Sequence, residues 1–282
     1  MHPSHRRRYA GAVAAILLAA LSAHALSSSA QSLEEFDSDF LDTPTDGPDL
    51  SQAESLIVGE TNKLRQEHGL SKVETNSQLA QTARYFAAFM ARTSNYGHNA
   101  DGNRPSQRAS LFEYDYCIVS ENIAKLFDST GFEAQKLGQQ FYEGWRDSPG
   151  HRKNILDEFV TETGVAIAFN PDTGRYYGVQ MFGRPRSQSQ RFRVANRTDQ
   201  SLKYSLMAAG REASAAKAFD LPPMSSRTHI RCRPASIDWQ WTEDAEELRA
   251  ESGTIYVITA DPSGYVITRE QLEHLQGRPK RE

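Results

Sequence analysis

The spacing of apolar residues changes once along the chain, and this change limits the possible folds more than any other feature. Up to about residue 145, apolar side chains recur every three or four positions, as in Leu79, Ala83 and Phe86, which is typical of amphipathic helices. Beyond residue 190 come short runs of β-branched and aromatic residues separated by turn residues, such as RFRVAN and GTIYVIT. These runs predict strands, so we expect an α+β domain followed by a β-rich one.

The first domain is expected over residues 51–185. Ser51 and Glu54 have capping-box spacing, and Gly69 suits the position just after a helix. A later helix places Leu137, Phe141 and Trp145 on one face. Two strand-like runs, GVAIAF and RYYGVQMFG, flank the turn sequence NPDTG and predict a hairpin that closes the domain.

The second domain is expected over residues 186–282, after a polar linker at 184–191. Six short strand-like runs predict a small β-sandwich. Trp239 and Trp241 lie two positions apart and therefore share one face of a strand. We favour their packing in the sandwich core over the alternative, an aromatic anchor for a partner or a glycan.

The N-terminal 30 residues have the layout of a secretory signal: a basic start, an apolar run and small residues. Residues 31–50 are acidic and rich in Ser, Asp, Pro and Gly, which predicts a disordered linker. We therefore expect an exported protein, secreted or periplasmic, with no membrane span after cleavage. Removing residues 1–30 removes three arginines and no acids, which shifts the formal charge from -4 to -7. This negative net charge argues against nucleic-acid binding, which needs clustered lysines and arginines.

The chain has two cysteines, Cys117 and Cys232. In an oxidising compartment they could form one disulfide, or they could remain separate thiols. A chain of this length is not expected to need the bridge in order to fold.

Three residues of the first domain could form a site: His98 in YGHNADG, Glu121 in SENIA and His151 in WRDSPGHRKNIL. Ser148 is a good N-cap and Pro149 suits the first helical position, so His151 falls in the first turn of a helix. The positive end of the helix dipole disfavours a protonated imidazole. A neutral ring can bind a metal or accept a proton.

The order of these motifs resembles the CAP superfamily, the cysteine-rich secretory, antigen 5 and pathogenesis-related proteins, in its short bacterial form. ETNKLRQEHGL, NSQLAQTAR, GHNADG, SENIA, WRDSPGHRKNIL, TGVAIAF and YYGVQMFG occur in that order between Glu54 and Gly183. The resemblance implies an α-β-α sandwich with a central cleft lined by two histidines and two acids. By motif, His98, Glu121 and His151 occupy three of these positions, and Glu143 is the nearest candidate for the fourth.

Such a donor set could hold zinc or another divalent cation. Three residues are expected to support the cleft: Asn122, whose amide can satisfy backbone groups, Ser148 and Gln180. Gln180 could equally be an outward polar residue of an alternating strand. Arg65 and Arg108 are expected to be structural or solvated.

The resemblance implies binding more readily than catalysis, and we assign no catalytic residue. We expect an exported binding module for a lipid, another small ligand or an envelope protein. The alternative is a hydrolase in which a metal activates water or a His–Glu pair acts as general base. A third possibility is a vestigial cleft, with the β-rich domain attaching the protein to a surface or partner.

Overall fold

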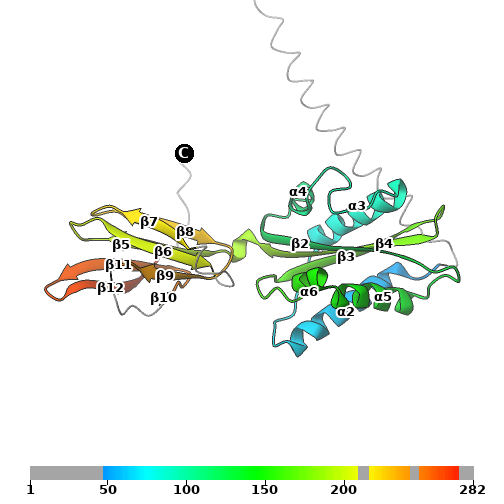
Figure 1. Cartoon of the computed structure of the whole chain (residues 1–282), viewed down its shortest axis with the longest axis horizontal. Helices are drawn as coiled ribbons and strands as arrows, with labels where there is room; N and C mark the ends of the chain where they lie inside the picture. The colour runs from blue at the N-terminus through cyan, green and yellow to red at the C-terminus, as the bar shows by residue number, and fades with distance from the viewer. Residues whose placement is uncertain (1–46, 209–215, 242–247, 273–282) are drawn as a thin grey trace, which may run out of the picture.

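The computed structural model describes residues 47–208, 216–241 and 248–272 and contains two domains arranged side by side (Figure 1). The predicted signal segment and all but the last four residues of the predicted acidic linker lie outside the described residues. In the part of the chain that is described, no helix is both long and apolar enough to cross a membrane.

The first domain is a four-stranded sheet with helices on both faces (Figure 1). Its strand order is β1-β3-β4-β2, in which β1 pairs parallel to β3 and the other pairs are antiparallel. The strands are β1 (Glu74–Thr75), β2 (Tyr116–Phe127), β3 (Glu162–Asn170) and β4 (Arg175–Pro185). The helices are α2 (Leu50–Glu67), α3 (Ser77–Thr93), α4 (Pro105–Leu111), α5 (Ala134–Asp147) and α6 (Pro149–Ile155).

Two apolar cores hold these layers together. Helices α2, α5 and α6 cover one face of the sheet, where Leu137, Phe141 and Trp145 are completely buried, as their spacing predicts. Helices α3 and α4 cover the other face, where Leu79 and Phe86 pack in a separate cluster. Because both faces are covered, β3 and β4 are buried over most of their length. This is the α-β-α sandwich that the resemblance implies.

The start of α2 differs from the sequence prediction. Asp49 is the N-cap, and its carboxylate accepts a hydrogen bond from the backbone N–H of Gln52. Ser51 lies in the first turn and donates its hydroxyl to Asp49. Glu54 does not close a capping box but accepts the backbone N–H of Ile167 in β3 at 2.8 Å, and burial raises the pKa of this carboxyl.

The second domain is a sandwich of two four-stranded sheets, as predicted. One sheet has the order β10-β9-β6-β7 and the other β12-β11-β5-β8. The first contains β6 (Leu202–Ala208), β7 (Lys217–Leu221), β9 (Ala235–Trp239) and β10 (Leu248–Arg249). The second contains β5 (Gln190–Asn196), β8 (Ser226–Arg231), β11 (Thr254–Asp261) and β12 (Gly264–Gln271). Trp239 is buried, and its ring lies 5.3 Å from that of the partly buried Trp241, so both tryptophans belong to the core.

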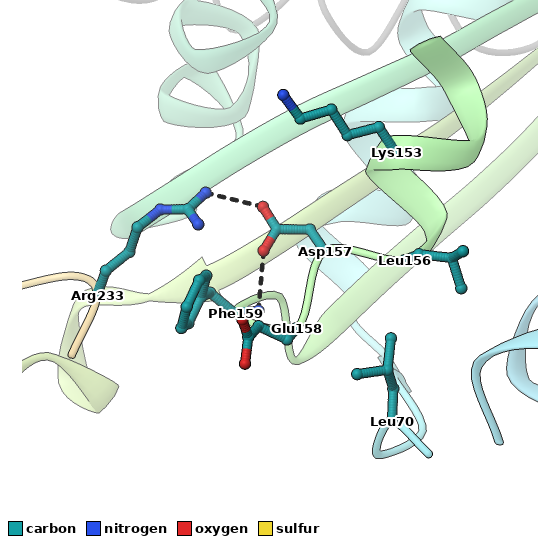
Figure 2. A pocket seen from close by; sticks show the side chains of 7 residues that line it. All are labelled: Leu70, Lys153, Leu156, Asp157, Glu158, Phe159 and Arg233. Atoms are coloured by element: carbon teal, nitrogen blue, oxygen red, sulfur yellow. Dashed lines mark hydrogen bonds and ion pairs between the residues drawn. The ribbon is translucent and has the colours of Figure 1, made fainter. Parts of the chain in front are cut away.

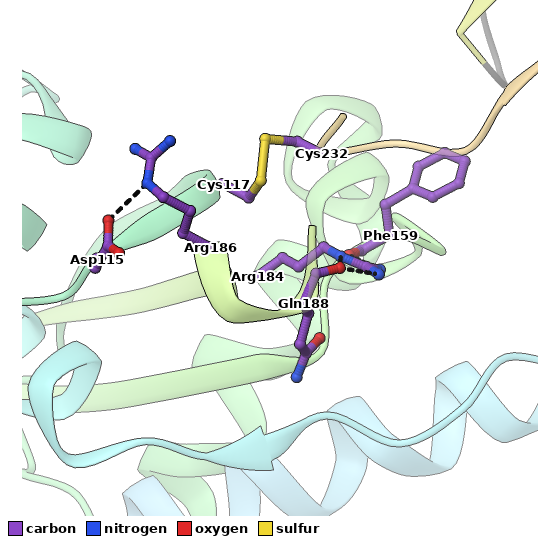
Figure 3. The surroundings of a disulfide bond; sticks show 7 residues. All are labelled: Asp115, Cys117, Phe159, Arg184, Arg186, Gln188 and Cys232. Atoms are coloured by element: carbon purple, nitrogen blue, oxygen red, sulfur yellow. Dashed lines mark hydrogen bonds and ion pairs between the residues drawn. A yellow bond between two sulfur atoms is a disulfide. The ribbon is translucent and has the colours of Figure 1, made fainter. Parts of the chain in front are cut away.

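The predicted polar linker at 184–191 is shorter in the structure: its ends belong to β4 and β5, which are separated by the 3-10 turn η1 (Arg186–Gln188) and Ser189. Cys117 of β2 and Cys232, just after β8, form a disulfide that joins the two domains (Figure 3). Close by, the Arg186 guanidinium pairs with the exposed carboxylate of Asp115 at 2.8 Å. The sequence left the state of the cysteines open, and the fold resolves it as a bridge across the domain junction.

Candidate functional site

The fold brings His98 and Glu121 into contact. His98 lies in the turn after α3, and Glu121 lies on β2. The Nδ1 atom of His98 is 2.8 Å from Oε1 of Glu121. A carboxylate can only accept a hydrogen bond, so Nδ1 carries a proton, and in the neutral form of the ring the free lone pair is therefore on Nε2. About half of the His98 side chain is exposed, whereas that of Glu121 is buried.

Arg108 of α4 is fully buried and donates a hydrogen bond to the second oxygen of Glu121, Oε2. Its guanidinium is 2.7 Å from Glu121 Oε2 and 2.7 Å from Asp101 Oδ1, and it donates to the backbone carbonyl of His98 at 2.9 Å. The same guanidinium lies 3.4 Å from the centre of the Phe86 ring. Arg108 is therefore structural, as expected, but its place next to the predicted site was not anticipated.

His151 lies in the first turn of α6, which starts where the sequence predicts. Ser148 occupies the N-cap position and Pro149 follows it. The Ser148 side chain makes no capping hydrogen bond; its carbonyl accepts from the backbone N–H of Arg152 at 2.8 Å. Burial, and secondarily the nearby His98, lower the pKa of His151. His151 is therefore neutral at physiological pH.

The ring of His151 also has an unusual atom. Its Nδ1 is buried and has no hydrogen-bond partner among the described residues. Buried polar atoms in folded proteins nearly always have a partner. A ring nitrogen left without a partner, with His98 near enough to lower the pKa of its ring, indicates a place where a ligand could bind.

Two asparagines tie β2 to α6 behind the histidines. Asn122 is fully buried and donates its amide to the backbone carbonyl of His151 at 3.2 Å. Asn154 donates to the side-chain oxygen of Asn122 at 2.9 Å and to the backbone carbonyl of Glu121 at 3.1 Å. Asn154 was not identified from the sequence, although its position three residues after His151 places it on the same side of the helix.

The remaining predicted residues lie outside these contacts. Gln180 of β4 is fully buried and donates to Thr61 of α2 at 2.9 Å, so the alternative of an outward polar residue is wrong. Glu143 accepts a hydrogen bond from Gln139 on its own helix at 2.9 Å. No contact joins Glu143 to either histidine among the described residues, and its role as a fourth cleft residue stays a prediction.

We call His98, Glu121 and His151, with Arg108 behind them, the histidine cluster. Across the described ranges, no group of three or more His, Cys, Asp and Glu side chains is arranged to hold a metal ion. Each oxygen of Glu121 already accepts one hydrogen bond, so imidazole nitrogens are the donors of this cluster that remain without a partner.

A surface pocket of about 690 Å³ lies at the domain junction, on the C-terminal side of α6 (Figure 2). There Arg233 pairs with Asp157 at 2.8 Å, and its guanidinium lies 4.5 Å from the centre of the Phe159 ring. The lining residues are Leu70, Lys153, Leu156, Asp157, Glu158, Phe159 and Arg233. The helix that carries His151 therefore ends at the contact between the two domains.

Comparisons with known proteins cover the first domain. Residues 58–182 match the family model of the cysteine-rich secretory proteins, CAP. The uncharacterized protein YkwD of Bacillus subtilis is 29% identical over 144 residues, which is 50% of this chain and 52% of YkwD. The uncharacterized membrane protein YlbC of the same organism is 31% identical over 117 residues, 41% of this chain and 31% of YlbC. The chain thus spans about half of the first of these relatives and less than a third of the second.

Among solved structures, an outer surface protein from Borrelia burgdorferi is similar, with a TM-score of 0.42 and 18% identity over 47% of this chain and 92% of that one. The family match covers the segment in which the structure places the α-β-α sandwich and the histidine cluster. Residues 58–182 of the first domain therefore match the CAP family of cysteine-rich secretory proteins.

Proposed function

We propose that the CAP domain is an exported binding module in which His98 and His151 bind a divalent cation such as zinc. The contact between His98 Nδ1 and Glu121 Oε1, at 2.8 Å, carries the proposal. In metal sites, a ligating histidine commonly donates its other ring N–H to a carboxylate, which fixes the tautomer and the ring orientation. Glu121 supplies such a carboxylate, so we assign it the role of positioning His98 rather than that of a ligand.

The chemistry of the remaining donors fits a metal. His151 is held neutral, and its Nδ1 has no partner among the residues described. Two imidazoles supply half of the tetrahedral set that zinc prefers. A bound cation would therefore keep open positions for water or for an anionic group of a ligand. Open positions suit a binding site better than a purely structural metal site.

The ligand that such a module would hold is a lipid, another small molecule or an envelope protein. A cation with open positions would attract carboxylate or phosphate oxygens of that ligand. The export of the module rests on the signal-like N-terminal 30 residues.

Calorimetric titration of the chain with zinc, on protein purified without a histidine tag, tests the proposal. We expect binding in the micromolar range by the unaltered chain, because only two protein ligands are provided. The double variant His98→Ala/His151→Ala should lose this binding. His68→Ala is the matched control, since His68 is an exposed histidine whose ring contacts Leu64 and Arg152. Equal zinc binding by the double variant and the control would refute the proposal.

A further inference from the structure

We propose that the edge arch of the second domain, residues 217–231, docks on the surface of an anionic lipid bilayer. The arch consists of β7, the connection at 222–225 and β8. Each of the two strands is the last in its sheet, and they lie together along one side of the sandwich (Figure 1). This surface belongs to the second domain and is independent of the histidine cluster.

Three cations of the arch converge on one aromatic ring. The charged groups of Lys217, Arg227 and Arg231 lie 5.5, 5.3 and 6.0 Å from the centre of the Phe219 ring. No carboxylate within the described ranges forms an ion pair with any of the three. Gathering three like charges costs free energy that an anionic partner would offset.

The groups next to these cations do not neutralise them. Asp220, on the same strand as Phe219, pairs with Lys203 of β6 at 3.7 Å. His229 lies between Arg227 and Arg231 in the sequence but is buried, and its Nε2 is hydrogen-bonded to the hydroxyl of Tyr204 at 2.7 Å. Burial and the three cations lower the pKa of His229 to about 4. The excess positive charge of the arch is thus carried by the lysine and the two arginines.

The arch also exposes two large apolar side chains, Met224 at 64% and Ile230 at 60%. Met224 adopts a left-handed backbone conformation, with φ of 51°, which bulky residues rarely tolerate. Its backbone N–H donates to the carbonyl of Thr198 at 3.2 Å, which fixes the turn. Met224 lies in the connection just before β8, whereas Ile230 alternates with Arg227 and Arg231 and therefore lies on the opposite face of β8. Cations together with an exposed apolar side chain such as Met224 are typical of segments that bind anionic membrane surfaces.

The cations and the exposed apolar side chain of Met224 together favour a bilayer over two simpler explanations of this surface. Charged residues on edge strands also prevent sheets from pairing edge to edge, but that purpose does not call for an exposed Met224. A soluble polyanion would satisfy the cations and leave Met224 in water. A surface with anionic headgroups above an apolar layer accommodates the three cations together with Met224.

Sedimentation with lipid vesicles tests the proposal, using the chain from residue 31 so that the apolar signal segment does not itself bind lipid. The expected result is binding to vesicles of phosphatidylglycerol and phosphatidylcholine and none to phosphatidylcholine alone. Arg227→Glu/Arg231→Glu should weaken binding at least about 30-fold, because each basic residue near an anionic surface adds a roughly fivefold affinity and here two charges are reversed. Met224→Gly should weaken it as well, and glycine suits the left-handed turn.

The matched control is Arg249→Glu/Arg269→Glu, which makes the same charge change on β10 and β12 at the opposite edge of the sandwich. It should retain most of the binding. Circular dichroism identifies any variant that fails to fold. If Arg227→Glu/Arg231→Glu does not fold, the milder variant Arg227→Gln/Arg231→Gln is used in its place. An equal loss in the control, or no binding of the unaltered chain to anionic vesicles, would overturn the proposal. So would unchanged vesicle binding by Met224→Gly together with displacement by polyphosphate, which would identify a soluble polyanion as the partner.

Discussion

Replacing Arg108 with methionine is expected to lower the free energy of unfolding by about 3–5 kcal/mol, because it leaves buried carboxylates without their cation. Arg108 is fully buried and bonds to both Glu121 and Asp101 at 2.7 Å. Its loss also removes the donor to the His98 carbonyl. Urea unfolding followed by circular dichroism measures the effect, and zinc titration of any folded fraction should show weakened binding.

Two further variants make this prediction specific. Arg84→Met removes an exposed arginine from α3, and it should change stability by no more than about 0.5 kcal/mol. Arg108→Lys keeps the positive charge but lacks the fork that reaches two carboxylates and a carbonyl. We expect it to fold with intermediate stability. If Arg108→Met were as stable as Arg84→Met, the buried network would not support the histidine cluster.

Replacing Cys117 and Cys232 together with serine is expected to lower the free energy of unfolding by about 5 kcal/mol in the chain-entropy description. The bridge closes a long loop, with a sequence separation of 115, and joins the two domains. Without the bridge, the contacts between the domains next to Cys232 are those of Arg233, which pairs with Asp157 and lies over the Phe159 ring. Each domain keeps its own apolar core, so we expect both to fold still.

Tryptophan fluorescence during urea unfolding measures this effect, since Trp145 reports on the first domain and Trp239 and Trp241 on the second. The unaltered chain treated with a reductant should behave like the double serine variant. An unchanged urea midpoint in both samples would show that the bridge does not constrain the unfolded chain.

The sequence predicted those elements whose signal is local. The spacing of Leu137, Phe141 and Trp145 is sufficient to define the buried face of α5, because a helix places such residues on one side. The start of α2 was misassigned because Asp49 and Ser51 are both good caps. Strand β7 was missed because it is short, lies at a sheet edge and is largely exposed, so it lacks the alternation of a half-buried strand.

The candidate site could be predicted only in part, for a related reason. The helix start before His151 is encoded by its neighbours Ser148 and Pro149. Nothing in the spacing of His98 and Glu121, 23 residues apart, indicates that they touch, and only the family resemblance suggested it. Burial of an arginine is against the usual preference for exposure, so the position of Arg108 could not be read from its residue type.

The same limit applies to the second domain. Asn196 begins a glycosylation-like NRT sequence, but its side chain is fully buried and donates to three backbone carbonyls, those of Gln200, Leu221 and Pro222. The short motif therefore serves a structural role. A pattern of three residues carries too little information to separate a surface acceptor from a buried donor, whereas the contacts of the folded chain do so directly.

The central claim is that Glu121 holds His98 with its Nε2 free for a metal beside a neutral His151. Nitrogen-15 NMR of the imidazole rings, with and without zinc at mildly alkaline pH, tests it most directly. We expect His98 in the Nδ1–H tautomer without metal and zinc-induced shifts in His98 and His151, while the resonances of His68 and His229 stay in place. An Nε2–H tautomer at His98, or zinc that shifts neither His98 nor His151, would contradict the claim.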